Sequence, residues 1–192
     1  MPNATARSSA NWVSRVSEDR DLMLPAAAAT ALCRELPRAA DLAAAMPLIE
    51  AQRQLLLGDG LLTVNHVLWP DAAGAPEAID LQRIWSSRPA EYPVAGRKRK
   101  TLTPWTRQLL LGGEIFIGEG QAALQQVFDD HRLILSMGLQ SVLNVPLVRA
   151  DGCCFATFNV LGTGAQWSVL EKLQIELLAA LARPFVARHV EG

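Results

Sequence analysis

Alternating apolar and polar positions predict the strands of this chain. Residues 62–68 and 79–86 each alternate over the length of one strand, and residues 114–117 form a shorter apolar segment. The clearest alternation runs through residues 141–149 and 153–161, which are separated by a turn sequence. We therefore expect an antiparallel sheet built from these segments.

Helical patterns lie toward the two ends of the chain. An Ala-rich run after Pro25 predicts a short helix over residues 25–35, because proline is well accepted in a first helical turn. A longer helix is expected over residues 38–57, with a kink or a break at Pro47. A final long helix is expected over residues 168–189.

The final helix begins with a capping box, in which the Ser168 and Glu171 side chains accept from each other's backbone N–H groups. Pro184 is expected to kink it near its end. We expect its buried stripe to be Leu170, Leu173, Leu177 and Leu181. Further apolar residues exceed what one sheet face requires: Val169, Ile175 and Val186. We therefore expect a homodimer through the terminal helices.

The middle of the chain predicts short helices. Thr103 is a good N-cap, because Pro104 follows it at the first helical position. Residues 121–128 are a second helical segment, and Asp129 or Asp130 is expected to cap a third.

Asp151 and Gly152 predict a two-residue hairpin turn, and counting outward from it pairs Asn144 with Asn159. One face of this hairpin then carries a plain apolar set: Leu143, Val145, Leu147, Ala156, Phe158 and Val160. The other face mixes apolar and polar side chains: Val142, Asn144, Pro146, Val148, Phe155, Thr157 and Asn159.

The element order is typical of an α+β fold: helix, two strands, a helical middle with one short strand, a hairpin and a long terminal helix. We expect an antiparallel sheet flanked by helices, with long helices near both termini. Residues 1–37 are expected to form a loose arm and a short helix, and residues 38–192 the folded domain.

Composition excludes several classes of protein. The 192 residues are 50% apolar and 19% charged, which is ordinary for one globular domain. The net charge of −1 gives no electrostatic reason to expect nucleic acid as a partner. No apolar run is long enough for a membrane span, and the N-terminus has no signal-peptide pattern. Three cysteines without metal-type spacing indicate reduced thiols and a cytoplasmic location.

The hairpin and the helix after it resemble the end of a GAF domain. The segment 141–147 with its Val-Pro-Leu, a turn containing Gly152, the strand 155–160 and a capped helix follow that family's pattern. Upstream, Arg88 to Val94, with Tyr-Pro-Val, resembles a subgroup of bacterial stand-alone GAF proteins. The resemblance implies a GAF/PAS-like sheet flanked by helices, a small-molecule pocket between the sheet and the helical middle, and dimerisation through terminal helices.

Three polar residues of the hairpin are candidates for the floor of that pocket. Asn144, Thr157 and Asn159 share one sheet face, where they could hydrogen-bond a polar ligand. The alternative is that this face meets solvent, or that the amides bond each other across the strands.

Aromatic residues lie in the segments that line GAF pockets. Trp85, Tyr92 and Trp105 would suit a flat or cyclic ligand, although core packing alone would also hold them. The basic run 97–100 is expected to be a solvated loop, with attraction of an anionic ligand as the alternative.

The histidines and cysteines give weaker signals. Asp129, Asp130 and His131 are consecutive on a helix, so they point in different directions and chelate poorly; we predict no metal site there. His131 is counted among the ligand-binding candidates. His66 shares a face with apolar residues and is expected to belong to the core. Cys154 is expected on the core face, and Cys153 on the polar face without a histidine beside it.

Two functions stay open. The chain is expected to be a stand-alone sensor or accessory protein that binds a small organic ligand. The alternative is a GAF-fold enzyme with lyase, hydrolase or redox chemistry on a small metabolite, using Cys153, His131 or His66. Two titratable groups within hydrogen-bond reach in the pocket would favour the enzyme, whereas aromatics and amides alone would favour binding. The sequence identifies neither the ligand nor a cofactor.

Overall fold

The computed structural model describes residues 24–70 and 76–192. The loose arm expected at the N-terminus falls in residues 1–23, outside the described residues. The helical elements are α2 (Ala26–Glu35), η2 (Leu36–Arg38), α3 (Leu42–Leu57), α4 (Pro104–Thr106), η3 (Arg107–Leu111), α5 (Gln121–Val127), α6 (His131–Ser136) and α7 (Val169–Glu191). The strands are β1 (Gly60–Leu68), β2 (Ala78–Ser86), β3 (Arg97–Thr101), β4 (Phe116–Glu119), β5 (Ser141–Val148) and β6 (Cys154–Gly162).

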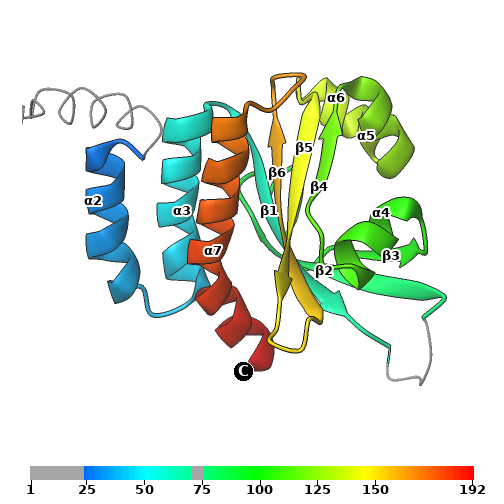
Figure 1. The fold of residues 1–192 in the computed structure, drawn as a ribbon, viewed down its shortest axis with the longest axis horizontal. Coiled ribbons are helices and arrows are strands. Elements are labelled where there is room, and N and C mark those ends of the chain that lie inside the picture. The colour runs from blue at the N-terminus through cyan, green and yellow to red at the C-terminus, as the bar shows by residue number, and fades with distance from the viewer. Residues whose placement is uncertain (1–23, 71–75) are drawn as a thin grey trace, which may run out of the picture.

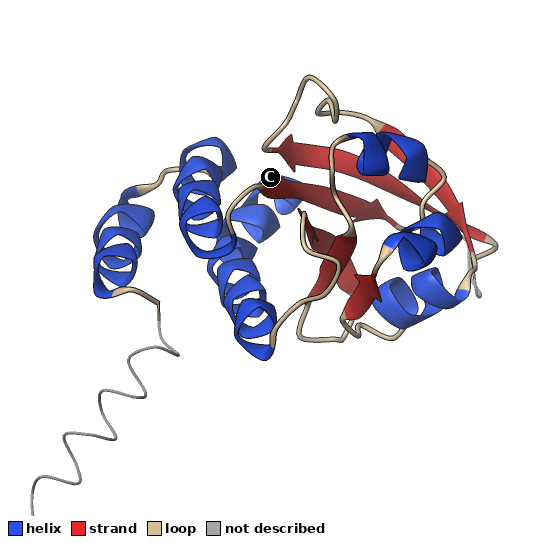
Figure 2. Cartoon of the chain, turned by 90° about the horizontal axis from the view of Figure 1, so that it is seen from above, coloured by secondary structure: helices blue, strands red, loops and turns tan. Residues whose placement is uncertain are grey.

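The described strands form one six-stranded sheet in the order β3-β2-β1-β6-β5-β4, with every neighbouring pair antiparallel. Figures 1 and 2 show α2, α3 and α7 on one side of this sheet and α4, α5 and α6 on the other. These faces are called the α3–α7 side and the α4–α6 side below. The predicted α+β fold, with its antiparallel sheet between helices, is confirmed.

The two sides of the sheet are packed differently. On the α3–α7 side one large apolar cluster joins Met46 and Ile49 of α3 to Ile175 and Leu178 of α7 and to the strands beneath them. On the α4–α6 side the apolar residues form two smaller clusters, one around Leu124 and the other under α4 and η3. Polar and charged residues lie between these two clusters, and they form the candidate site described below.

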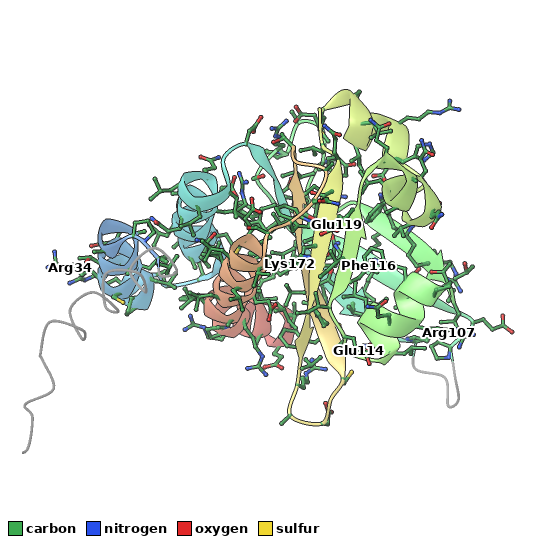
Figure 3. The ribbon with its side chains drawn as sticks, turned by 45° about the horizontal axis from the view of Figure 1, so that its top comes forward. Arg34, Arg107, Glu114, Phe116, Glu119 and Lys172 are labelled. Atoms are coloured by element: carbon green, nitrogen blue, oxygen red, sulfur yellow. The ribbon has the colours of Figure 1, made fainter. Side chains whose placement is uncertain are left out.

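The ends of the sheet are tied to the helices by ion pairs and side-chain hydrogen bonds. Glu119, at the end of β4, accepts from the N–H of Trp167 at 3.2 Å and pairs with Lys172 of α7 at 3.0 Å (Figure 3). These contacts hold the pKa of Glu119 below its ordinary value, because the Trp167 N–H and the Lys172 ammonium favour the charged carboxylate.

The register of the β5–β6 hairpin is as predicted, although its turn is different. Asn144 lies opposite Asn159. The turn is not the predicted two-residue loop, because the N–H of Arg149 already bonds the carbonyl of Cys153 and leaves residues 150–152 as a three-residue loop. A β-bulge beside this loop restores the expected pairing further along the strands.

That bulge exchanges the faces of two side chains. Val148 lies opposite Cys154 and Leu147 opposite Ala156, so Phe155 is the extra residue. Phe155 packs in the α3–α7 cluster, and Cys154 packs on the α4–α6 side. Both predicted orientations are wrong, because a bulge adds one residue and shifts the alternation of one strand end.

The helix α3 begins later than predicted and does not break at its proline. Asp41 caps it by accepting the N–H of Ala44 at 2.9 Å, and the preceding Leu36–Arg38 turn is separate. Pro47 removes one backbone hydrogen bond, but the helix continues to Leu57. Packing of its buried face against α7 and the sheet offsets that loss.

The helix α7 begins at the predicted capping box, with Ser168 and Glu171 each accepting from the other's N–H, and it continues past Pro184. The predicted buried stripe is wrong, since Leu173 is 59% exposed and Leu177 is 42% exposed. The residues that it buries are Gln174, Ile175, Leu178, Ala179, Ala182, Phe185 and Val186. The alanines of this face allow α3 to approach closely, so Leu173 and Leu177 are left on the outer surface, while Leu170 and Leu181 are half-buried.

The basic run is an edge strand, not the predicted loop. Arg97–Thr101 pairs with β2, which overrides the weak strand propensity of its lysines and arginines. Exposure alternates along it, with Arg97 and Arg99 outward and Lys98 and Lys100 turned inward. The predicted short strand 114–117 is likewise shifted: β4 begins at Phe116, where pairing with β5 starts.

None of the helices in residues 24–70 and 76–192 combines the length and the apolar character that a membrane crossing requires.

Candidate functional site

A small cleft lies on the α4–α6 side, where β1, β2 and β3 meet the segments before α4 and α6. Its volume is about 60 Å³. This is room for a few heavy atoms, whereas pockets for drug-sized ligands measure about 300–1,000 Å³. Aliphatic side chains form part of its wall: Leu61, Leu81, Ile134 and Leu161. The cleft therefore suits a compact guest.

The floor of the cleft is a hydrogen-bonded ladder of buried side chains. Trp105 Nε1 donates to Asn144 Oδ1 at 3.0 Å, and Asn144 Nδ2 donates to Asn159 Oδ1 at 2.8 Å. The two amides are 1% and 5% exposed. The solvent-facing alternative is therefore excluded for Asn144 and Asn159. The other alternative, that the amides bond each other across the strands, is observed, and both residues also line the cleft.

The ladder continues underneath the cleft. Asn159 Nδ2 lies 3.1 Å from Thr157 Oγ1 and 3.4 Å from Thr63 Oγ1. Thr157 is fully buried and supports Asn159 from below, while Thr63 lines the cleft. The amides are thus satisfied by their neighbours, which makes the floor rigid and already ordered.

A charged trio forms the wall opposite this floor. Tyr92 donates its hydroxyl to Asp130 Oδ2 at 2.9 Å, and Lys98 Nζ donates to the same oxygen at 2.6 Å. Burial favours the neutral acid, but the Lys98 ammonium and the Tyr92 hydroxyl outweigh it, so the pKa of Asp130 lies below its ordinary value. Burial and the adjacent carboxylate raise the pKa of Tyr92 well above its ordinary value.

Asp130 holds the predicted N-cap position of α6, but its side chain, like that of Asp129, is an ion-pair partner. Neither Asp129 nor Asp130 accepts a capping hydrogen bond from α6. Asp129 Oδ2 instead accepts from Lys100 Nζ at 2.8 Å, which lowers the pKa of Asp129. The two aspartates therefore join α6 to the edge strand β3.

Arg83 of β2 completes the charged wall. Its guanidinium lies over the Tyr92 ring, 4.7 Å from the centroid, and Nη1 donates to the carbonyl of Pro93 at 3.0 Å. Its Nε is buried and has no hydrogen-bond partner among residues 24–70 and 76–192. Burial lowers the pKa of this guanidinium, so its charge is incompletely compensated.

Trp85 does not line the cleft, although Tyr92 and Trp105 do. A bulge in β2 leaves Ile84 unpaired between Arg83, opposite Asn65, and Trp85, opposite Val64. Trp85 therefore turns to the α3–α7 side, where it packs against the apolar cluster. Simple alternation would place Trp85 and Arg83 on the same face of β2, but the bulge puts their side chains on opposite faces.

The predicted histidines lie outside the cleft lining. His131 Nδ1 is 3.0 Å from the carbonyl of Phe128 at the start of α6. His66, opposite Ala156, is on the α3–α7 side, where burial and the nearby charge of Arg149 lower its pKa. In the described part of the chain, no three His, Cys, Asp or Glu side chains gather as a metal ion would require.

The cysteines are also outside the cleft. Cys154 is buried, and burial raises the pKa of its thiol to about 12, which makes it a poor nucleophile at neutral pH. Cys153 is half-buried in the hairpin loop, where its N–H bonds the Asp151 side chain. Neither thiol has the setting expected of a catalytic cysteine.

Arg83 and Asp130 of the cleft were missed as ligand-binding candidates, and Lys98 was covered only by the alternative that the basic run attracts an anionic ligand. The alternation of residues 79–86 placed Arg83 on one face with Leu81, which also lines the cleft. Asp130 was interpreted as a helix cap, because nothing local reveals that an edge strand 32 positions earlier supplies a lysine to it. Long-range pairing of β3 with β2 was the missing information.

No protein-family model matches the sequence, and no curated protein sequence matches it.

Solved structures share the fold at low sequence identity. The GAF domain of a phosphoenolpyruvate-protein phosphotransferase from Coxiella burnetii has a TM-score of 0.61 at 11% identity, covering 90% of this chain and 98% of that chain. The GAF domain/HD domain protein from Geobacter sulfurreducens has a TM-score of 0.54 at 16% identity, covering 77% and 93%.

The chromophore-binding domain of a bacteriophytochrome from R. palustris has a TM-score of 0.55 at 16% identity, and the match covers 85% of this chain. The chain spans only 61% of the length of that domain. At these identities the likeness establishes the fold alone. The chain therefore has the fold of GAF domains, as the hairpin sequence indicated.

Proposed function

We propose that this chain is a small-molecule-binding GAF-like domain that acts as a sensor or accessory protein, with its ligand in the cleft on the α4–α6 side. The observation that carries the proposal is the ordered Trp105–Asn144–Asn159 floor beneath that cleft. A polar floor that is already ordered costs little conformational entropy when a ligand binds. The GAF fold, typical of small-molecule-binding sensor domains, supports the same assignment.

The enzymatic alternative draws support from the same cleft. Tyr92, Lys98 and Asp130 are titratable groups within hydrogen-bond reach of one another, which was the feature expected of an enzyme. A general acid or base, however, works best with a pKa near the working pH. The pKa of Tyr92 is raised and that of Asp130 is lowered, so both move away from neutrality. These shifts favour binding over proton transfer.

The terminal helices support a homodimer as part of the proposal. An apolar hollow of about 540 Å³ lies between α2, η2 and α7, bordered by Leu32, Leu36 and Leu181. Beside it α7 exposes Leu173 and Leu177, and a second copy of this chain would cover both. Light scattering should give a mass of twice 20.8 kDa, and Leu173→Glu should shift it toward one copy. A single-copy mass for the unaltered protein would refute the dimer.

The three free thiols, Cys33, Cys153 and Cys154, fit a reducing cytoplasm, which we include in the proposal.

The proposed function is tested by native mass spectrometry of the protein purified from its natural host. Retention of a small molecule, lost on mild denaturation, would support it. The companion experiment offers the purified protein a library of small metabolites and follows the indole N–H resonance of Trp105, which reports on the floor. The proposal fails if no molecule is retained and no compound shifts that resonance.

A further inference from the structure

The charges around the cleft are unbalanced. Arg83, Lys98 and Lys100 line it, and Asp130 is the one acidic residue among its lining residues in the described part of the chain. Three positive charges against one negative charge leave a surplus of two. Asp129 offsets part of it from outside, where its carboxylate is 88% exposed and screened by water.

This surplus is built into the strand β3 and is not a property of a solvated basic tail. Alternation sends Arg97 and Arg99 to solvent and turns Lys98 and Lys100 inward. The Lys100 side chain is only 13% exposed. Lysines that merely protect an edge strand from further pairing would gain nothing from this burial. Asp130 and Asp129 compensate the two inward lysines, which leaves Arg83 as the cleft cation without a carboxylate partner among the described residues.

The cations of the cleft also have unused hydrogen-bonding capacity. A guanidinium has five N–H donors, and Arg83 has one hydrogen bond among the described residues, to Pro93. Lys98 and Lys100 each make one side-chain hydrogen bond there, to Asp130 and Asp129, although an ammonium has three donors. A negatively charged guest would use these donors without displacing the existing bonds.

We propose that the cleft selects a compact monocarboxylate, a short-chain carboxylic acid, whose carboxylate meets Arg83 and Lys98 and whose short tail packs on Leu81, Ile134 and Trp105. This rests on the proposed function and names its ligand class. A planar carboxylate fits the donors of a guanidinium. Inorganic phosphate fits the cleft less well for two reasons. It would make no use of the apolar part of the wall, and the Asp130 carboxylate repels a doubly charged anion more than a singly charged one.

The size of the cleft sets the other limit. A volume of about 60 Å³ accommodates a few heavy atoms and excludes a nucleotide or a tetrapyrrole unless the walls move apart. The short tail of the acid is therefore part of the selectivity, since a longer chain would have to displace Ile134 or Trp105.

The test compares three probes of similar size: propionate, its neutral isostere propionamide, and inorganic phosphate. Binding is followed by the indole N–H resonance of Trp105, assigned by its loss in Trp105→Phe. We expect propionate to shift this resonance with saturation, propionamide to bind at least tenfold more weakly, and phosphate to bind more weakly than propionate. Equal binding of propionate and propionamide, or tighter binding of phosphate, would overturn the carboxylate assignment.

Matched variants locate the charge recognition. Arg83→Gln and Lys98→Gln should each weaken propionate binding at least tenfold. The control is Arg99→Gln, which removes one positive charge from the outward face of β3, the strand that carries Lys98. It should leave the affinity for propionate within about twofold, because exposed charges are screened. If Arg83→Gln or Lys98→Gln fails to fold, Lys100→Gln takes its place, because Lys100 also lines the cleft. Equal losses in the inward and outward variants would refute recognition by the cleft.

The two proposals fail separately. A neutral or cationic molecule retained from the host, or shifting the Trp105 resonance, would leave the binding function standing and overturn the carboxylate. Absence of any saturable shift with propionate also overturns the carboxylate, whatever other compounds bind. Only the lack of both a retained molecule and a responding compound removes the binding function itself.

Discussion

Arg53 and Arg83 both bring a guanidinium group into the protein, but from opposite sides of the sheet and into different surroundings. Arg53, on α3, has a side chain only 1% exposed and donates from Nε and Nη2 to both oxygens of Glu50, each at 2.8 Å. Its Nη1 donates to the carbonyl of Gly58 at 3.1 Å. Arg83, on β2, has one hydrogen bond, to Pro93, and an unpartnered Nε.

The difference reflects how each side of the sheet is completed. Around Arg53 the backbone is packed closely: a Cβ on Gly60 would lie 2.6 Å from the carbonyl oxygen of Leu161 and 2.8 Å from Arg53 Nη1, so the site requires glycine. The core between α3, α7 and the sheet is therefore completed within the chain. On the α4–α6 side the cleft lies between two apolar clusters, and the charge of Arg83 in it is only partly compensated. A ligand that compensates this charge would gain binding energy.

The largest effect is expected from Arg53→Leu. Removing one partner of a buried ion pair leaves the Glu50 carboxylate without compensation, which typically costs about 3–5 kcal/mol. Urea denaturation should show this loss of unfolding free energy.

Arg83→Leu is the matched control for that change, with the same substitution on the other side of the sheet. It leaves no carboxylate stranded, so we expect a change of less than about 1 kcal/mol. Equal losses in the two variants would contradict the contrast between the two sides.

The next largest effect is expected from Asn144→Leu. Although Leu is of similar size, this change leaves Trp105 Nε1 and Asn159 Oδ1 buried without partners. At about 1–3 kcal/mol for each of these two unsatisfied groups, the loss of unfolding free energy should be at least about 2 kcal/mol. Asn65→Leu alters a half-buried amide beside the same cleft but outside the ladder, and should cost less than about 1 kcal/mol. A neutral Asn144→Leu would show that the ladder is not formed.

A smaller loss is expected from Ser168→Ala at the start of α7. Ser168 Oγ accepts the Glu171 N–H at 3.2 Å, and an N-cap of this kind contributes about 1 kcal/mol. The melting temperature should fall while propionate binding on the other side of the sheet is unchanged. Ser168→Asp, which keeps a capping oxygen, should restore it; failure to do so would argue that the cap is not what stabilises the helix.

The smallest effect concerns acid and the Asp130 carboxylate of the α4–α6 side. The pKa of Asp130 is lower in the folded protein than its ordinary value of 3.8, so the unfolded chain takes up the proton first. Its contribution to stability is complete above pH 3.8 and is lost as the pH falls through the lowered folded pKa. Unfolding free energies measured from neutral pH down to acid should decline less steeply in Asp130→Asn. An identical decline would mean that the trio carries no such linkage.

Local sequence determined the elements whose signals are complete within a few residues. The Ser168–Glu171 and Thr103–Thr106 caps needed only neighbouring hydrogen-bond donors and acceptors, and both formed. Counting outward from the predicted Asp151–Gly152 turn paired Asn144 with Asn159, and the pairing is observed because the β-bulge at Phe155 compensates for the longer turn. From this pairing the floor of the cleft was predictable before any tertiary contact was known.

Tertiary structure decided which faces the remaining residues occupy. The bulges at Ile84 and Phe155 each add one residue to a strand, and this turned Trp85 away from the cleft and exchanged the sides of Phe155 and Cys154. The close approach of α3 decided which face of α7 is buried. The pairing of β3 with β2 decided that Lys98 turns inward. Periodicity is a property of one segment, whereas a face is defined only by what packs against it, and for that reason the charged wall could not be derived from the sequence alone.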